Sequence, residues 1–276
     1  MPRLQDNVLD CVVYLYPSKH EAEEGIGSGG SGFLLRVAAK LIPESHFNFV
    51  VTNRHVVDGG AKCIRLNTQD GKTDVFEFNP DRLFVSKADD LAIILMPTIP
   101  ETYSINAIPR ESLVTKDFIK EHDIGIGDEI LMLGRFINRE GAQRNSPTAR
   151  FGHIAQMMGD PINGQEEAIL GEVRSIGGYS GSPVYVLPTK IVERKGKPIP
   201  HDRAVILGVD FCHIQNLTRA YDQHGNELDH FRLPQNTGMA GIVPAWKVED
   251  LLNSAVVQNE LKGIEEATLK YRGSHS

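Results

Sequence analysis

Residues 177–185, GGYSGSPVY, place a serine in a glycine-rich turn ahead of an apolar run. Gly, Ser and Pro are ordinary turn residues, so a turn alone explains Ser180. The stretch also suits acyl transfer, because Gly178 has no side chain and would let a substrate carbonyl approach the serine. The backbone amides of Gly178 and Ser180 could then converge on one oxygen as an oxyanion hole. A serine hydroxyl is a weak nucleophile at neutral pH, so this second interpretation requires a base elsewhere in the chain.

His55 is the candidate base. Six of the ten histidines lie among polar residues, as solvated surface rings do: His20, His122, His201, His224, His230 and His275. His55 instead follows the apolar run 47–51, FNFVV, and the polar pair Thr52-Asn53, where we expect a buried strand to end. A strand end holds a side chain rigidly and leaves it accessible.

An acidic partner for His55 comes 35 residues later. Asp89 and Asp90 directly precede the apolar run 91–96, which predicts a short core strand. A carboxylate at the start of such a strand is tolerated where it accepts an N–H from an imidazole. The alternative is an aspartate pair in a tight turn, and for either aspartate taken alone that alternative is the better interpretation.

His55, Asp90 and Ser180 occur in the order His, Asp, Ser, each at the edge of a β-rich apolar segment. With the motifs around them, the chain resembles the trypsin-like (chymotrypsin-fold) serine proteases, and among these the bacterial HtrA-like and glutamyl-endopeptidase-like branches. The resemblance extends over about residues 9–255. Its motifs are TNRHVV, DDLAIILM and GGYSGSPVY at the three residues, and GSGGSGFLL, IGDEILMLG, FGHIAQ and GMAGIVPAWKVEDLL elsewhere.

This resemblance implies a serine endopeptidase. Ser180 would be the nucleophile, and His55 would act as general base and then as general acid. Asp90 would orient His55 and stabilise its cation, and the amides of Gly178 and Ser180 would hold the oxyanion. We choose Asp90 because the resembled motif is Asp-Leu-Ala, and Asp89 is the alternative. No cofactor is implied, since hydrolysis needs only these groups and water.

The resemblance also implies a substrate pocket, built shortly before the nucleophile and along the strand after the next glycine. The residues at these positions are Arg174, Ser175, Asp210, Phe211, Cys212 and His213. Arg174 or His213 would favour an acidic substrate side chain, whereas Asp210 would favour a basic one. Phe211 with Cys212 would favour a small apolar side chain. The sequence does not rank these preferences.

The fold that we expect is all-β, with two packed antiparallel six-stranded β-barrels and a C-terminal α-helix. Short apolar runs split by turn signals are typical of antiparallel β-structure, and they fill most of the chain. We expect one trypsin-like peptidase domain over residues 1–276. Its parts would be an N-terminal barrel (9–96), an inter-barrel linker (97–128), a C-terminal barrel (129–245), a helix (246–265) and a tail (266–276).

The C-terminal segment changes to helical spacing. The apolar side chains expected on one helix face are Val248, Leu251, Leu252, Val256 and Leu261. We expect this face to pack on the second barrel.

The resemblance implies a protein or peptide substrate as the partner, and composition and charge indicate no nucleic-acid partner. The net charge is -7, and the basic stretch 190–203 lacks interleaved aromatic residues, so we expect no nucleic-acid binding and interpret the stretch as an exposed hairpin loop. The segment 1–16 fits neither a signal peptide nor a membrane span. The three cysteines, Cys11, Cys63 and Cys212, show no paired spacing, which favours reduced thiols and a cytoplasmic location. Oligomeric state is not predicted.

Tyr179 departs from the resembled family. It stands where digestive-type enzymes have the Asp that pairs with a freed N-terminus, so we expect activity without N-terminal cleavage. The stretch 137–150 is longer than the corresponding loop of compact relatives, and either lines the cleft or is a solvated loop.

Two other functions stay open. One is a catalytically silent protease-fold binding or scaffold protein whose oxyanion loop is collapsed. The other is a metal site, for which the candidate ligands are Asp222, His224, Glu227, Asp229 and His230. Their spacing matches no metal pattern and a polar hairpin explains them, so we expect no metal.

Overall fold

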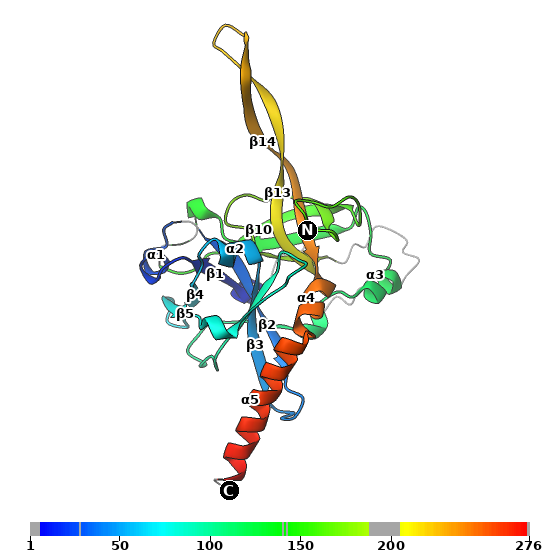
Figure 1. The fold of residues 1–276 in the computed structure, drawn as a ribbon. Coiled ribbons are helices and arrows are strands. Elements are labelled where there is room, and N and C mark those ends of the chain that lie inside the picture. The colour runs from blue at the N-terminus through cyan, green and yellow to red at the C-terminus, as the bar shows by residue number, and fades with distance from the viewer. Residues whose placement is uncertain (1–5, 28, 140, 142, 188–204, 275–276) are drawn as a thin grey trace.

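The computed structural model describes residues 6–27, 29–139, 141, 143–187 and 205–274. Two β-sheets form its body, one from each half of the chain (Figure 1). The strands of the N-terminal sheet are β1 (Val12–Tyr16), β2 (Gly30–Ala38), β3 (His46–Thr52), β4 (Cys63–Asn67), β5 (Thr73–Glu77), β6 (Leu83–Val85), β7 (Ala92–Leu95) and β8 (Ile108–Pro109). Their order is β5-β4-β1-β2-β3-β7-β6, with β8 pairing with β2.

The C-terminal sheet is a closed ring of six antiparallel strands, in the order β10-β11-β14-β13-β12-β9. Its strands are β9 (Glu129–Gly134), β10 (Thr148–Gln156), β11 (Ile169–Glu172), β12 (Pro183–Val186), β13 (Val205–Tyr221) and β14 (Glu227–Pro244). The predicted mainly β fold is therefore confirmed. The prediction of two closed six-stranded barrels is not confirmed, because the described N-terminal sheet has eight strands and its end strands, β5 and β6, do not pair with each other.

Strands β1 and β7 of the N-terminal sheet are buried on both faces, which explains their unbroken apolar runs. In β1, Val13 and Leu15 point into one apolar cluster, while Val12, Tyr14 and Tyr16 point into another. The second cluster continues into the C-terminal ring. The two halves thus share part of one core, which fixes their relative positions.

The segment between the two sheets, predicted as a linker, is ordered. Ile108 of β8 pairs with Leu35 of β2, and the Val114 amide donates to the Ile206 carbonyl of β13 at 3.0 Å. The helices of the described residues are α1 (Lys19–Glu24), α2 (Arg54–Asp58), α3 (Lys116–His122), α4 (Ala245–Leu252) and α5 (Ala255–Gly273), with 3-10 turns η1 (Asp6–Cys11), η2 (Pro80–Arg82), η3 (Arg110–Ser112) and η4 (Ile137–Arg139).

The C-terminal helix differs from the prediction in four ways. It is two helices, because the chain breaks after Leu252 and restarts at Ala255, and the second helix continues to Gly273 instead of ending at 265. The break shifts the helical phase, so that Val257 is buried and Val256 is exposed. α5 also contacts the N-terminal half of the chain, because the Leu41 amide in the loop between β2 and β3 donates to Glu265 at 2.7 Å. None of the described helices is long and apolar enough to cross a membrane.

Candidate active site

His55 and Asp90 meet at the edge of the N-terminal sheet. We expected His55 at the end of a strand. The strand β3 ends at Thr52, and His55 lies in the first turn of the short helix α2 that follows it. Its Nδ1 is 2.6 Å from Oδ2 of Asp90, and its backbone N–H donates to Oδ1 of the same carboxylate at 2.9 Å. A carboxylate accepts hydrogen bonds, so Nδ1 carries the hydrogen and Nε2 is left with its lone pair.

Asp89 points elsewhere. Its Oδ1 accepts a hydrogen bond from Nε2 of Gln165 at 2.8 Å, and Nζ of Lys247 in α4 is 3.6 Å from the same oxygen. Gln165 also accepts the backbone N–H of Asp90, at 2.9 Å. Asp90, and not Asp89, therefore faces His55, and Asp89 holds the glutamine that holds the Asp90 backbone.

Ser180 lies in a turn whose backbone requires glycine. The Tyr179 amide donates to the Ile176 carbonyl at 3.1 Å, and Gly178 has a φ of +94°, as the third residue of a type II turn needs. Gly181 has a φ of +91°, and a Cβ there would lie 1.9 Å from the Ser31 carbonyl oxygen of β2. The turn is thus pressed against the N-terminal sheet.

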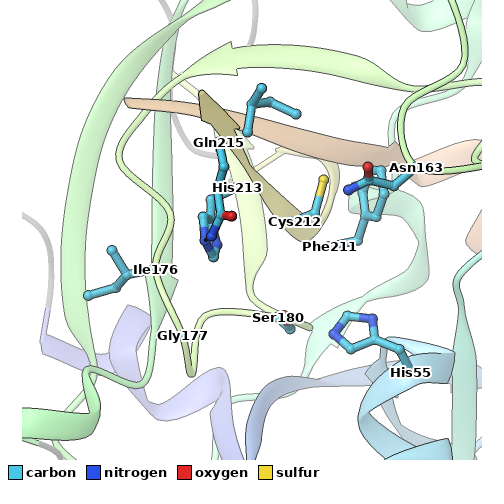
Figure 2. A pocket seen from close by; sticks show the side chains of 10 residues that line it. His55, Asn163, Ile176, Gly177, Ser180, Phe211, Cys212, His213 and Gln215 are labelled. Atoms are coloured by element: carbon cyan, nitrogen blue, oxygen red, sulfur yellow. Dashed lines mark hydrogen bonds between the residues drawn. The ribbon is translucent and has the colours of Figure 1, made fainter. Parts of the chain in front are cut away.

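The amides of Gly178 and Ser180 have no hydrogen-bond acceptor among the described residues, whereas the Tyr179 and Gly181 amides both have one. Two neighbouring free donors beside a serine are what an oxyanion needs. Among the described residues no hydrogen bond joins His55 to Ser180, although Figure 2 shows the His55 ring directed toward Ser180. Such contacts are often loose in the absence of substrate.

The side chain of Tyr179 fixes the turn to the C-terminal barrel. Its side chain is fully buried, its hydroxyl is hydrogen-bonded to Thr148 at the start of β10, and the Arg150 guanidinium lies 4.7 Å from the centre of its ring. Packing and a cation–π contact therefore hold the position where digestive-type enzymes have an aspartate.

His55 and Ser180 line one cavity of about 490 Å³ (Figure 2). Of the predicted pocket residues, Phe211, Cys212 and His213 line it as well. The lining residues that the sequence did not indicate are Asn163, Ile176, Gly177, Ile214 and Gln215. Ile214 and Gln215 directly follow the predicted pocket residues on the same strand. They were missed because the predicted pocket ended at His213.

The other three predicted pocket residues do not line this cavity. Arg174 is exposed, while Ser175 and Asp210 are buried. The Ser175 hydroxyl donates to Oδ2 of Asp210 at 2.8 Å, and Oδ1 has no hydrogen-bond partner among the described residues. Burial raises the pKa of the Asp210 carboxyl to about 7, against the weaker opposing effects of the Ser175 hydrogen bond and of the charges of His55 and Arg150.

Comparison with solved structures decides the fold. A serine-to-alanine variant of the HtrA-type protease AlgW, solved with a tripeptide, superposes with a TM-score of 0.52 at 18% sequence identity, covering 90% of this chain and 60% of that one. HtrA-type protease AlgW with a tripeptide gives 0.50 at 19% identity, covering 88% and 60%. The chain has the fold of the HtrA-type serine proteases. It spans about three fifths of the length of these two proteins. No family model and no curated protein matches the sequence.

In this HtrA-type fold the stretch 137–150 bridges the two sheets instead of lining the cavity, as far as its described residues show. Asn145 is buried, its backbone N–H donates to Oδ1 of Asn67 at 2.7 Å, and its Nδ2 donates to the Arg65 carbonyl at 2.7 Å, both in β4. Ile137 lies beneath the nucleophile turn, where a Cβ on Gly178 would be 2.8 Å from its Cγ1. The expectation of a cleft wall does not fit these contacts, whereas the exposed Gln143, Arg144 and Ser146 fit the alternative of a solvated loop.

The candidate metal ligands lie at the tip of the β13–β14 hairpin. Asp222 caps the tip turn by accepting the backbone N–H of His224 at 2.8 Å and that of Asn226 at 2.9 Å. Within the described residues, no three His, Cys, Asp or Glu side chains are grouped closely enough to hold a metal ion. The three cysteines are free thiols, and burial raises the pKa of Cys11 to about 12 and of Cys212 to about 11. The basic stretch 190–203 lies wholly outside the described residues.

Proposed function

We propose that this chain is a serine endopeptidase that cuts peptide bonds through a His55–Asp90–Ser180 triad. The observation that carries the proposal is the 2.6 Å contact between Nδ1 of His55 and Asp90 on the wall of the cavity that holds Ser180. The HtrA-type fold supports it, and two solved proteins of that fold hold tripeptides. A peptide or protein is therefore the substrate that we propose.

The chemistry follows from the free atoms of the site. Oγ of Ser180 attacks the substrate carbonyl carbon while its proton passes to Nε2 of His55, and Asp90 stabilises the resulting imidazolium. The amides of Gly178 and Ser180 donate to the oxyanion of the tetrahedral intermediate. The C–N bond then breaks, the leaving amine takes the proton from His55, and a water molecule repeats the sequence on the acyl-enzyme.

Fluorophosphonate labelling tests this function, because the reagent reacts with an activated serine and not with an ordinary one. We expect a single adduct on Ser180, located by intact mass and peptide mapping, that is absent from Ser180→Ala. Ser104→Ala, a change outside the cavity lining, should label like the wild type. A folded chain without an adduct would favour the alternative of a silent scaffold.

A further inference from the structure

The hairpin formed by β13 and β14 leaves the body of the molecule as a free ribbon (Figure 1). β13 pairs with β12 only from Val205 to Val209, and β14 pairs with β11 only from Met239 to Ile242. Beyond these points the described strands pair only with each other. A two-stranded ribbon is marginally stable in water by itself, so this extension calls for a bound partner.

Large apolar side chains are exposed on both faces of the ribbon. They are Leu217, Tyr221, Leu228, Phe231 and Leu233. Leu217 is paired with Pro234 on one face and Leu233 with Thr218 on the other, and both leucines are more than half exposed, at 64% and 57%. The ribbon therefore has no wholly polar face, which is typical of a binding surface.

The two outer edges of the ribbon differ. Pro234 in β14 lacks an N–H, and a proline is accommodated in a ladder where that N–H would point outward, so the outer edge of β14 lacks a donor. From Gln215 to Tyr221 the outer edge of β13 contains no proline. Exposed edges with complete donors and acceptors readily pair with another extended chain.

The β13 edge is also continuous with the candidate active site. The cavity that holds His55 and Ser180 is lined by Phe211 through Gln215 of the same strand. A polypeptide lying in the cavity with its scissile bond at Ser180 would reach the free part of the edge by following β13 past the irregularity between His213 and Gln215. Seven further residues, at about 3.3 Å each, would pair with some 23 Å of strand.

We propose that the outer edge of β13, from Gln215 to Tyr221, binds an extended apolar segment of the polypeptide substrate as an added strand. This inference rests on the proposed endopeptidase function. Alternate side chains of the added strand lie beside Leu217 and Tyr221, so segments with alternating apolar residues bind best. The site therefore selects unfolded or extended polypeptides with an apolar stretch next to the cleaved bond.

The test measures binding to Ser180→Ala, so that it does not depend on turnover. The probes are fluorescein-labelled peptides of alternating valine and glutamine, one of about four residues and one of about eleven, which is long enough to fill the cavity and the edge. We expect the long peptide to bind at least tenfold more tightly by fluorescence anisotropy. Equal affinity of the two peptides would overturn the proposal.

A trimmed protein provides the first control. Asn216 and Gln235 are paired in register, so Asn-Gly in place of residues 217–234 closes the ribbon with a two-residue turn. Trimming should abolish the gain of the long peptide and leave the affinity of the short one within about twofold. A trimmed chain that sediments as a smaller species than the intact chain would show that the ribbon binds a second copy, and would overturn the proposal.

Methylated peptides provide a second control that needs no protein variant. N-methylation of alternate residues removes the amide donors along one edge of the bound strand. Of two complementary methylated long peptides, one should lose the gain in affinity and the other should keep it. If both bind like the parent peptide, strand addition is wrong. If instead Ser180 of the wild type resists fluorophosphonate while the long peptide still binds, the endopeptidase function fails and the peptide site stands.

Discussion

The hydroxyl of Ser31 donates a 2.7 Å hydrogen bond to the carbonyl oxygen of Gly178, across the boundary between the two sheets. The same hydroxyl accepts the Arg135 backbone N–H at 2.8 Å, and the Ser31 N–H donates to the Ser180 carbonyl at 2.8 Å. The N-terminal sheet thus holds the two peptide groups that flank the pair Tyr179–Ser180. With these carbonyls fixed, the amides of Gly178 and Ser180 stay free for an oxyanion.

Ser31→Ala should slow the acylation of Ser180. The change removes the donor to the Gly178 carbonyl and the acceptor of the Arg135 backbone N–H in a buried site, which costs about 1–3 kcal/mol of stability. It also loosens the turn, and we expect the fluorophosphonate labelling rate to fall about tenfold to a hundredfold. This rate is measured by quenching the labelling reaction at successive times, at a temperature where the variant is fully folded.

Ser112→Ala is the matched control, since Ser112 is a buried serine in η3 that the cavity does not include. It should lower the melting temperature without changing the labelling rate of the folded chain. Equal labelling rates for Ser31→Ala and Ser112→Ala would contradict a positioning role for Ser31.

Tyr179 leads to a prediction about activation. Because burial, the hydrogen bond to Thr148 and the contact with Arg150 hold this side chain, the turn needs no ion pair with a freed N-terminus. We expect the intact chain to label at Ser180, with an adduct mass equal to that of the uncleaved protein plus the reagent less HF, because fluoride leaves as the serine oxygen bonds to phosphorus. Labelling that begins only after N-terminal truncation would contradict this.

Site residues that stand in a recognisable local motif could be predicted from the sequence. Residues that reach the site only through contacts with distant parts of the chain could not. His55 and Ser180 stand in motifs whose turn glycines and flanking apolar runs carry a local signal. Ser31 and Gln165 act through contacts 147 and 75 residues away in sequence, and neither has a local pattern that marks its partner. Asp210 was predicted as a pocket residue from its strand, but its burial depends on neighbours that the strand pattern does not show.

The strand count and the length of the β13–β14 ribbon were missed for a related reason. Polar alternation after Gln215 is typical of a surface strand and of an irregular loop alike. Only the pairing register of β13 with β14 distinguishes a strand from a loop here. In the C-terminal helices, the break near Asn253 moved the buried position from Val256 to Val257, because one inserted break changes the phase of every residue after it.

Gln165 should control the position of Asp90. Its side chain is buried, accepts the Asp90 N–H and donates to Asp89, so Gln165→Leu removes both contacts. We expect kcat to fall about tenfold to a hundredfold with little change in KM, because the imidazole loses its fixed orientation.

Lys247→Met is the control for this prediction, because Lys247 faces Asp89 from α4 and does not contact Asp90. It should reduce the free energy of unfolding and leave kcat of the folded chain unchanged. An unchanged kcat in Gln165→Leu, or an equal loss in Lys247→Met, would show that the network supports stability alone.

The pH dependence of stability should depend on Asp210. Burial raises the pKa of its carboxyl from 3.8 to about 7, so the folded chain keeps this proton up to neutral pH. The unfolded chain loses it near pH 4, and between about pH 4 and pH 7 the unfolded state binds fewer protons than the folded state. The free energy of unfolding should therefore fall as the pH rises through this window, by up to about 4 kcal/mol from this group.

Asp210→Asn removes the titration and keeps an oxygen that accepts the Ser175 hydroxyl. In urea denaturation at pH 5 and pH 8, we expect the variant to lose less stability between the two values than the wild type, and to be the more stable protein at pH 8. Asp89→Asn is the contrasting variant, because that buried carboxylate faces Lys247 and its neutralisation should destabilise the chain at pH 8. If Asp210→Asn is also less stable than the wild type at pH 8, the folded chain holds the Asp210 charge favourably and the raised pKa is wrong.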